Sequence, residues 1–339
     1  MKRAIFDTKN VLVTGGAGFI GSNLCDRLVS GAKVICVDNF ITGKEKNIDH
    51  LLANPNFRFI KHDITKPLDL ENLPELQKFK IQFQGIQEIY HLACPTSPKR
   101  FEEHKMLIAD TLSIGTKNML DLAVKYDAKF LLFSSSVVYG PRRSDNEKIS
   151  ETDLGQVDIL SERAVYDEGK RFAETLTKTY RDVYNIDAKI IRPFRIYGPR
   201  MALGEGHMIS DFINDALDGK DLEIFGDKDF NTSLCYVSDL IDAALKLMET
   251  EYFGPYNIGS DVDVNLYELA QKIIKLTGSK SKITFKEKLL FMTPLCLPNI
   301  AKARDDLGWL PIVTLEKGLD WTIHDLRASK GLKGVEHAI

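Results

Sequence analysis

The stretch "NVLVTGGAGFIGSNLCDRLVSGAKVICVDNF", residues 10–40, constrains the fold more than any other part of the chain. Two continuous apolar runs, "VLVT" and "KVICVD", predict strands that are covered on both faces, and the segment between them predicts a helix. Four glycines separate the first strand from the helix: Gly15, Gly16, Gly18 and Gly21. Glycine allows a tight turn and lets a pyrophosphate approach the backbone at the helix N-terminus. The stretch therefore predicts a dinucleotide-binding βαβ unit.

The acid at the end of the second predicted strand points to the kind of dinucleotide. Asp38 stands 20 residues after Gly18, where a carboxylate can accept hydrogen bonds from a ribose diol. The same carboxylate repels the 2′-phosphate of NADP, and no arginine follows it immediately. The sequence therefore predicts NAD as the cofactor.

Strands and helices alternate along the first 195 residues, as in an α/β protein. We predict a Rossmann-type doubly wound parallel sheet with a smaller C-terminal substrate lobe. Beyond the first unit, the expected elements are strands at 57–63, 86–93, 129–136 and 188–194 and helices at about 104–126 and 164–185.

After residue 195 this alternation breaks down. The segment "FMTPLCLPNIAKARDDLGWLP" (291–311) contains so many prolines that we expect no regular structure there. We assign residues 1–190 to an NAD-binding Rossmann domain and residues 191–339 mainly to a substrate-binding lobe. Some segments of the lobe are expected to return to the sheet.

Residues at the ends of the predicted strands are the candidate contacts of the cofactor. The third strand should end at Asp63 and Ile64, where adenine usually lies, although an acid at a strand end is often only a cap. The full set of candidates is Gly15, Gly18, Phe19, Ile20, Gly21, Asp38, Asn39, Asp63, Ile64, Leu92, Ala93, Tyr166 and Lys170.

The segment "RAVYDEGKR" (163–171) suggests the chemistry. Tyr166 and Lys170 are four residues apart on a predicted helix and so share a face. The lysine ammonium is expected to lower the tyrosine pKa from its usual ~10. Phenolate could then take a proton from a sugar or alcohol hydroxyl while hydride leaves for NAD.

The same spacing also occurs in ordinary charged helices, so a second segment is needed to support a catalytic role. The stretch "FSSSVVYG" (133–140) follows a central strand at the carboxyl edge of the sheet, where ligands bind in this architecture. Its serines can hydrogen-bond the same substrate hydroxyl.

These motifs together resemble those of the extended short-chain dehydrogenase/reductases, over nearly the whole chain. Besides the glycine turn, the matching segments are "HLACPTSP", "FSSSVVYG", "YDEGK", "RPFRIYGPR", "YVSDL", "YNIGS" and "LGWLP". Within that superfamily, "HLACPTSP" and "AVYDEGKR" are most similar to the UDP-glucuronate decarboxylase (UDP-xylose synthase) family.

The resemblance implies a role for three residues. Tyr166 would be the base, Lys170 its partner and the anchor of the cofactor ribose, and Ser135 the catalytic hydroxyl. It also implies a nucleotide-sugar substrate, UDP-linked in the decarboxylases, that tightly held NAD oxidises at C4.

The chain departs from the family at positions that decide between reactions. A family glutamate corresponds to Val137, and an aspartate of the 4,6-dehydratases corresponds to Ser136. Because elimination of water needs a positioned acid and base, these changes argue against a 4,6-dehydratase. A 4-keto uronate is a β-keto acid that loses CO2 readily, and a 4-epimerase needs only hydride return to the other face. Both of these reactions stay open.

The expected substrate pocket differs from the family pattern as well. Three family arginines correspond to His207, Thr232 and Cys296, and a family asparagine corresponds to Leu112. Arginines of this kind grip diphosphate bidentately, so their loss leaves that anion short of donors. Arg195 replaces the asparagine of the family R-x-F-N motif and is the candidate substitute.

Two further residues have both a functional and a structural interpretation. Cys94 could face the nicotinamide or be buried and inert. Arg163 could reach an acidic group of the substrate or pair with the helix acids Asp167 and Glu168, which we expect on the solvated helix surface. The candidate substrate contacts are Cys94, Ser136, Val137, Arg163, Arg195, His207 and Thr232.

Composition limits the partners and the location. A net charge of −3 gives no support for nucleic-acid binding as the main activity. The five cysteines show no metal-like spacing, so we expect free thiols, a reducing compartment and no metal site. No apolar run suggests a secretion signal or a membrane span, and we expect a soluble cytoplasmic protein.

The family resemblance also implies a homodimer formed by the helices near 104–126 and 164–185. Apolar residues on those helices, Leu112, Met119, Leu122 and Leu176, either form this interface or only cover the sheet.

Three functions remain open from the sequence. The leading one is NAD-dependent modification of a nucleotide sugar through a 4-keto intermediate, as in UDP-glucuronate decarboxylase. The second is a nucleotide-sugar 4-epimerase, and the third is a non-catalytic regulatory homologue that binds a dinucleotide. Intact Ser135, Tyr166 and Lys170 argue against the third.

Overall fold

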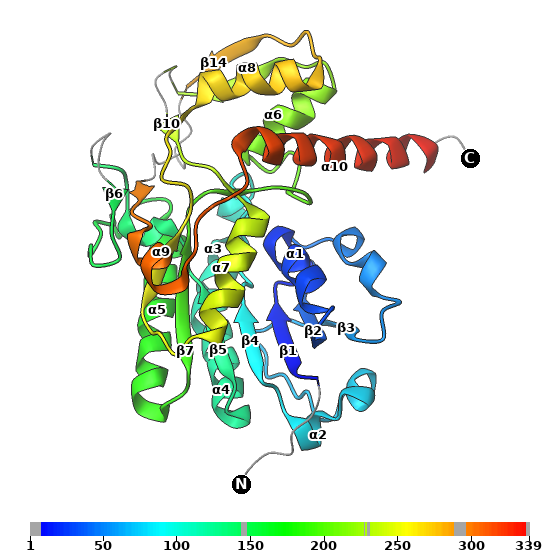
Figure 1. Ribbon diagram of the computed structural model, residues 1–339, viewed down its shortest axis with the longest axis vertical. Helices are drawn as coiled ribbons and strands as arrows, with labels where there is room; N and C mark the ends of the chain where they lie inside the picture. The colour runs from blue at the N-terminus through cyan, green and yellow to red at the C-terminus, as the bar shows by residue number, and fades with distance from the viewer. Residues whose placement is uncertain (1–7, 144–147, 227, 229–230, 288–295, 337–339) are drawn as a thin grey trace.

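A parallel sheet lies at the centre of the molecule (Figure 1). The computed structural model describes residues 8–143, 148–226, 228, 231–287 and 296–336, and within them seven strands join this sheet in the order β12-β7-β5-β4-β1-β2-β3. The strands are β1 (Asn10–Thr14), β2 (Lys33–Asp38), β3 (Phe57–Lys61), β4 (Glu88–His91), β5 (Lys129–Phe133), β7 (Ala188–Pro193) and β12 (Pro255–Ile258). The order reverses between β1 and β4, as in a doubly wound sheet. The predicted fold class is confirmed.

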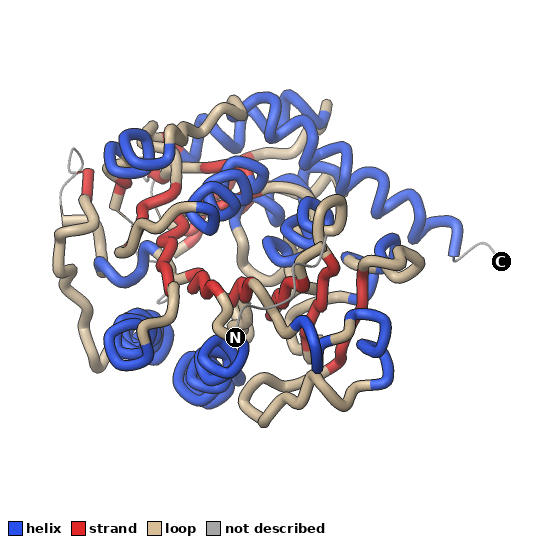
Figure 2. Tube along the Cα trace, turned by 60° about the horizontal axis from the view of Figure 1, so that its bottom comes forward, coloured by secondary structure: helices blue, strands red, loops and turns tan. Residues whose placement is uncertain are grey.

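Helices cover both faces of the sheet, as Figure 2 shows with helices in blue on either side of the red strands. Successive residues of a strand point to opposite faces. Accordingly, Val11 and Val13 pack in one apolar cluster with α1 (Phe19–Leu28) and α7 (Val237–Glu249). Leu12 packs in the other cluster, with α4 (Thr116–Tyr126) and α5 (Ala164–Tyr184). This double coverage explains the continuous apolar runs of the strands.

The helix predicted near 104–126 is divided by a wider turn. It consists of α3 (Phe101–Asp110), a π-helical turn η4 (Thr111–Gly115) and α4. Inside it, the hydroxyls of Thr111 and Ser113 each donate to the carbonyl four residues earlier, both at 2.6 Å. Such bonds compete with the helical ladder, and π-turns occur often at functional sites.

The remaining helices and short strands lie mostly beyond the carboxyl ends of the central strands. Figure 1 shows α6, α8 and α10 grouped at the top of the molecule. The helices are α2 (Ile81–Gln84), α6 (Met208–Leu217), α8 (Leu266–Thr277), α9 (Ala301–Leu307) and α10 (Leu315–Glu336). The short strands are β6 (Lys148–Ile149), β8 (Ile196–Tyr197), β9 (Leu222–Phe225), β10 (Asn231–Thr232), β11 (Cys235–Tyr236), β13 (Val264–Asn265), β14 (Ile283–Lys286) and β15 (Leu297–Pro298). The 3-10 turns are η1 (Glu45–Asn47), η2 (Asp49–Leu51), η3 (Pro74–Phe79) and η5 (Ser136–Tyr139).

Segments after residue 195 do contribute to the central sheet. Strand β12 pairs in parallel with β7, and α7 packs against the sheet face that α1 also covers. The domain boundary at 190 stays a prediction.

The prediction of no regular structure across 291–311 was wrong for its described part. Strand β15 and helix α9 lie within it, while residues 291–295 are outside the described residues. Pro298 is accommodated because it ends a short strand whose one partner among the described residues is β6. The Asn299 side chain accepts from the Ala301 N–H at 2.9 Å, and Gly308, with φ of 57°, ends the helix.

No described helix of the chain is both long enough and apolar enough to cross a membrane.

We predict that Gly21→Ala destabilises the protein. A Cβ at position 21 would lie 2.1 Å from the Gly15 carbonyl oxygen and 2.7 Å from the Gly16 Cα, and neither backbone atom can move cheaply. The free energy of unfolding in urea should fall by about 1–3 kcal/mol. Gly31→Ala is the control, because nothing lies within 4 Å of its Cβ position. Equal stability of the two variants would contradict the prediction.

Candidate active site

A cavity of about 700 Å³ lies at the carboxyl edge of the sheet. Parallel strands end together at this edge, so residues that follow different strands meet here. All but one of the candidate residues line this cavity. They are Gly15, Gly18, Phe19, Ile20, Gly21, Asp38, Asn39, Asp63, Ile64, Leu92, Ala93, Cys94, Ser135, Ser136, Val137, Arg163, Tyr166, Lys170, Arg195 and His207.

Thr232 is the candidate that the structure does not bring to the cavity. It lies in β10, which pairs with β13, and its side chain is buried with the hydroxyl donating to the Ser233 carbonyl at 3.4 Å. Cys296, aligned with another missing arginine, does not line the cavity either. It is buried in an apolar cluster with Val138, Tyr139 and Phe194.

The glycine turn forms a close-packed cradle at one end of the cavity. Gly15 has φ of 69°, and a Cβ there would lie 2.9 Å from the Ala93 Cα. Helix α1 begins directly after Gly18 and has no acidic residue in its first turn. The N-terminus of this helix is therefore suited to a phosphate group.

Asp38 holds the turn in place and keeps acceptor capacity for a ligand. Its carboxylate accepts from the Ala17 N–H at 3.0 Å and from the Phe40 N–H at 2.8 Å. Burial raises the pKa of Asp38, and these backbone donors oppose that rise. The Asn39 N–H is a third backbone donor to this side chain. Because a carboxylate has about four lone-pair sites, it keeps acceptor capacity for a ribose hydroxyl. The cradle and this acid fit NAD.

Asp63 has a structural role that the sequence also allowed. Its side chain accepts from the Thr65 N–H at 3.0 Å and from the Thr65 hydroxyl at 2.9 Å, which forms a capped turn after β3. Ile64 lines the cavity beside it and accepts at its carbonyl from Asn118.

Tyr166 and Lys170 lie at the other end of the cavity, on the first turns of α5. The Lys170 ammonium is 5.9 Å from the centroid of the tyrosine ring and donates to the Phe133 carbonyl at 2.6 Å. Gly169 allows this helix to lie close to η4, because a Cβ at 169 would be 2.6 Å from the Leu112 Cδ1. Leu112 therefore packs its apolar side chain beside Tyr166 and Gly169, at the position where the resemblance implied an asparagine amide.

The predicted lowering of the Tyr166 pKa was wrong for this structure. Burial raises the pKa of Tyr166 well above its usual value, and a hydrogen bond with Ser135 and the charge of Arg163 oppose this only in part. Burial also lowers the pKa of Lys170. The cost of desolvating the phenolate outweighs the attraction of the Lys170 ammonium. That ammonium donates its hydrogen bond to the Phe133 carbonyl and not to the phenol.

Cys94 and His91 are uncharged neighbours of this end of the cavity. Burial raises the pKa of Cys94 to about 11, so the thiol is protonated at neutral pH. His91 is buried between the hydroxyls of Thr14, at 2.8 Å, and Thr116, at 3.2 Å. Burial lowers the pKa of His91 to about 3, and its role is to join β1, β4 and α4.

Arg163 adopts the ion pair that the sequence allowed and also lines the cavity. Its Nη2 lies 3.3 Å from the Asp167 Oδ1. Asp167 is largely buried, with a side chain 13% exposed, so its expected position on the solvated helix surface was wrong. Glu168 pairs with Arg171 at 3.4 Å instead.

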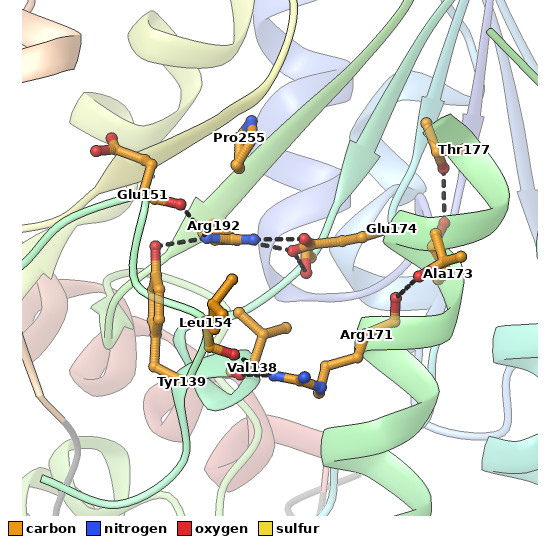
Figure 3. A network of polar contacts seen from close by, with 12 residues as sticks. Val138, Tyr139, Glu151, Leu154, Arg171, Ala173, Glu174, Thr177, Arg192 and Pro255 are labelled. Atoms are coloured by element: carbon orange, nitrogen blue, oxygen red, sulfur yellow. Dashed lines mark hydrogen bonds and ion pairs between the residues drawn. The ribbon is translucent and has the colours of Figure 1, made fainter. Parts of the chain in front are cut away.

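A buried polar network supports α5 one turn after Lys170 (Figure 3). Arg192 on β7 holds both carboxylate oxygens of Glu174, at 2.9 and 2.6 Å, and donates to the Tyr139 hydroxyl at 2.6 Å. Glu174 also accepts from the Ser134 hydroxyl at 2.5 Å. The network therefore fixes the serine segment and the Tyr166 helix to the same strand end.

Sequence reasoning missed Glu174 and Arg192. A signal was present, because Glu174 follows Lys170 by four residues and so shares its helix face. It also missed a contact across the cavity lining, where Glu205 accepts from the Ser97 hydroxyl and from the Arg100 Nε at 3.2 Å. Nothing in the sequence links segments so far apart.

Comparison with known proteins decides the family. The model of the NAD dependent epimerase/dehydratase family matches residues 11–259. The chain belongs to the NAD-dependent epimerase/dehydratase family. The predicted membership of the extended short-chain dehydrogenase/reductases and the predicted use of NAD are thereby confirmed.

Individual relatives place the chain more closely within this family. It is 40% identical over 318 residues to UDP-glucuronic acid decarboxylase 4 of Arabidopsis thaliana, a match that covers 94% of this chain and 68% of that protein. Among solved structures, UDP-glucose 4-epimerase of Thermotoga maritima is 28% identical with a TM-score of 0.83, covering 95% of this chain and 99% of that one. UDP-glucuronic acid 4-epimerase of Bacillus cereus, in complex with UDP-glucuronic acid and NAD, is 28% identical with a TM-score of 0.82, covering 94% and 99%. The chain is decarboxylase-like in sequence, as predicted.

We predict that Glu174→Ala strongly destabilises the protein. Removing this carboxylate leaves the buried Arg192 charge uncompensated, so the free energy of unfolding should fall by about 3–5 kcal/mol in urea titrations. Glu168→Ala on the same helix is the matched control, because its exposed pair with Arg171 contributes at most about 1 kcal/mol. A loss for Glu174→Ala as small as the control's would show that the network does not stabilise the fold.

Proposed function

We propose that this chain oxidises the C4 hydroxyl of a nucleotide-linked sugar and that UDP-glucuronate is its substrate, with loss of CO2 from the 4-keto product of that step. The observation that carries the proposal is the convergence of Ser135, Tyr166 and Lys170 on the same cavity that the glycine turn lines. Similarity to the UDP-glucuronic acid decarboxylases supports the choice of substrate.

The cofactor would be held by the residues that form the cradle. The N-terminus of α1 would bind the pyrophosphate, Asp38 a ribose diol, and the Asp63–Ile64 segment the adenine end. When bound, NAD supplies a hydride acceptor for C4 and a positive charge beside Tyr166.

Tyr166 is the proposed base for the C4 hydroxyl. Ser135 lies within hydrogen-bonding reach of Tyr166, so both can contact the same substrate oxygen. In the structure burial keeps the phenol protonated, and added positive charge favours the phenolate. Lys170 keeps a buried charge near the ring and fixes the strand end through the Phe133 carbonyl.

Loss of CO2 needs no further acid from the protein. In a 4-keto uronate, the electron pair of the breaking C5–C6 bond passes into the adjacent ketone, which forms an enolate. Protonation of this enolate at C5 by water, return of the hydride to C4 and return of the proton held by Tyr166 to the C4 oxygen would then complete UDP-xylose. Among the described residues of the cavity lining, the carboxylates are Asp38, Asp63 and Glu205, and each has another role given above. Val137 lines the Tyr166 end, where it offers no proton.

A 4-epimerase is the second candidate. The same apolar Val137 favours it, because epimerisation at C4 needs only the tyrosine and the return of hydride to the opposite face. Likeness to the UDP-glucuronic acid 4-epimerase of Bacillus cereus supports it as well.

One incubation separates these candidates. The purified protein is incubated with UDP-glucuronate, and the products are separated by chromatography. Release of CO2 with UDP-xylose supports the decarboxylase, UDP-galacturonate supports the epimerase, and no turnover of any UDP-sugar supports a non-catalytic homologue.

We predict that Tyr166→Phe lowers turnover about 10²–10⁴-fold, the usual contribution of a general acid–base group. NAD affinity, measured by calorimetry, should stay within about 2-fold of the parent, because the ring and Lys170 remain. Tyr184→Phe, an exposed position on the same helix, is the control and should leave both quantities unchanged. Turnover by Tyr166→Phe near that of the parent would exclude this tyrosine as the base.

The predicted homodimer remains a proposal, but the supporting residues change. Met119 and Leu122 are buried in the cluster that covers the sheet and Leu176 packs against it, whereas Leu112 is buried in the cluster between α3 and α5, so none of the four is available for an interface. The same helices expose other apolar side chains instead: Met106, Ile114 and Phe172 are 72%, 48% and 50% exposed. Such exposure is costly in water and supports an interface on α3, η4 and α5.

We predict that the double variant Met106→Glu with Phe172→Glu is a monomer at micromolar concentration, whereas the parent is a dimer by light scattering. Charges in the centre of an interface oppose association. Phe83→Glu, at a 77% exposed position on α2, is the control and should remain dimeric. A monomeric parent would contradict the proposal.

The five cysteines are free thiols, which supports the predicted reducing, cytoplasmic location.

A further inference from the structure

An arginine at the start of α3 is held in place by a carboxylate from a distant segment. Arg100 directly precedes α3, and its Nε donates to the Glu205 Oε2 at 3.2 Å. The Ser97 hydroxyl donates to the same oxygen, and the Lys99 N–H donates to the Glu205 carbonyl at 3.1 Å. All four residues line the cavity of the candidate active site. The contact therefore joins two walls of that cavity.

The bond to Glu205 uses only one of the three nitrogens of the Arg100 guanidinium. Among the described residues, the two Nη atoms of Arg100 have no hydrogen-bond partner, and its side chain is 40% exposed. A guanidinium that is fixed at Nε still presents its two Nη groups as a planar fork, which matches the spacing of phosphate oxygens. Arg100 is therefore oriented by the protein and keeps its bidentate edge for a ligand.

The charges near Arg100 favour an anionic ligand. Burial raises the pKa of Glu205, but the hydrogen bonds of Ser97 and Arg100 and the charges of Arg100 and Lys44 outweigh this effect and lower it below its usual value. Glu205 is therefore ionised at neutral pH. Lys44 and Lys99 line the cavity as well. Three cations thus accompany one carboxylate in this part of the lining, and their excess positive charge attracts anions.

Packing places Arg100 between the Tyr166 end of the cavity and the segment before α6. The residue after Arg100, Phe101, is buried in an apolar cluster against which Tyr166 packs. On the other side, Gly206 lies against the same segment, because a Cβ at 206 would be 3.1 Å from the Pro98 Cβ. These contacts are independent of the bond between Arg100 and Glu205.

This position indicates which anion of the substrate Arg100 would meet. If Tyr166 contacts the C4 hydroxyl, as the proposed function requires, the carboxylate of a uronic acid stays beside Tyr166, because it is attached to C5, the ring carbon next to C4. The diphosphate is attached to C1, across the ring from C4, and projects away from Tyr166. His207, where the resemblance implied an arginine, follows Glu205 by two residues.

We infer that Arg100, oriented by Glu205, binds the diphosphate of the nucleotide sugar through its two Nη groups. This inference rests on the proposed function. It gives the diphosphate a bidentate donor that positions 232 and 296 do not supply, since Thr232 and Cys296 do not line the cavity. The pyrophosphate of NAD has the same chemistry, so the test has to separate the two ligands.

The test measures three dissociation constants by calorimetry, with and without Arg100→Gln. UDP and UDP-glucuronate are titrated into the NAD-loaded protein carrying Tyr166→Phe, which prevents turnover, and NAD is titrated into the protein without ligand. The Kd values for UDP and UDP-glucuronate should rise by the same factor, about 10- to 100-fold, as expected for lost charge-assisted hydrogen bonds. The Kd for NAD should not change. The melting temperature should not change either, because Ser97 and Lys99 still bind Glu205.

Two further variants sharpen the comparison. Arg100→Lys keeps the charge without the planar fork and should give an intermediate loss for both UDP ligands. Arg304→Gln is the matched control. The Nε of Arg304 also donates to a carboxylate, the Asp305 Oδ1 at 2.8 Å, but Arg304 does not line the cavity. This control should leave all three Kd values unchanged.

Three results would overturn the inference and leave the proposed function intact. A loss confined to UDP-glucuronate would mean that Arg100 binds the sugar, a loss confined to NAD would mean that it binds the cofactor, and no loss for any ligand would make it an ordinary surface arginine. A parent protein that binds neither UDP nor UDP-glucuronate would overturn the inference and the proposed function together. If UDP binding depends on Arg100 but the parent does not turn over UDP-glucuronate, only the proposed function fails.

Discussion

The parallel pairing of β1 with β2 and β4 is the constraint on which the rest of the structure depends. Thr14, the last residue of β1, lies opposite Val37 and His91. Backbone bonds continue this pairing past the strand ends, from Gly15 to the Val37 carbonyl at 2.8 Å and from Leu92 to the Thr14 carbonyl at 3.2 Å. The glycine turn, the acid that ends β2 and the segment after β4 therefore meet at one edge.

The second end of the cavity is built by buried charge rather than by strand pairing. Lys170 and Glu174 project from α5 toward the ends of β5 and β7, where a carbonyl, a serine and Arg192 receive them. Each charged group is expensive to bury, and each is compensated by hydrogen bonds from a different element. The arrangement places Tyr166 precisely, because its helix cannot rotate without breaking these bonds.

The pKa of Tyr166 shifts in the opposite direction from the one that a tyrosine–lysine pair predicts by itself. Desolvation, which no residue spacing reveals, raises the pKa of Tyr166. The cations that oppose this rise include Arg163, which sequence reasoning treated as a substrate contact or a surface pair. The pKa of Tyr166 therefore depends on burial and on charges brought together from several elements.

The sequence by itself predicted the fold class and the use of NAD, which are confirmed, and it singled out Tyr166, Lys170 and Ser135 as the catalytic candidates. These depend on local features, namely apolar runs, glycines in a turn and residues four apart on a helix, which neighbours along the chain specify. Only the tertiary structure decided that Thr232 and Cys296 do not line the cavity, that Glu174 binds Arg192, and that Arg163 and Arg195 line the same cavity. These relations join residues that are far apart along the chain. They arise because packing and desolvation depend on which residues are close in space, and a pattern of neighbouring residues does not specify this.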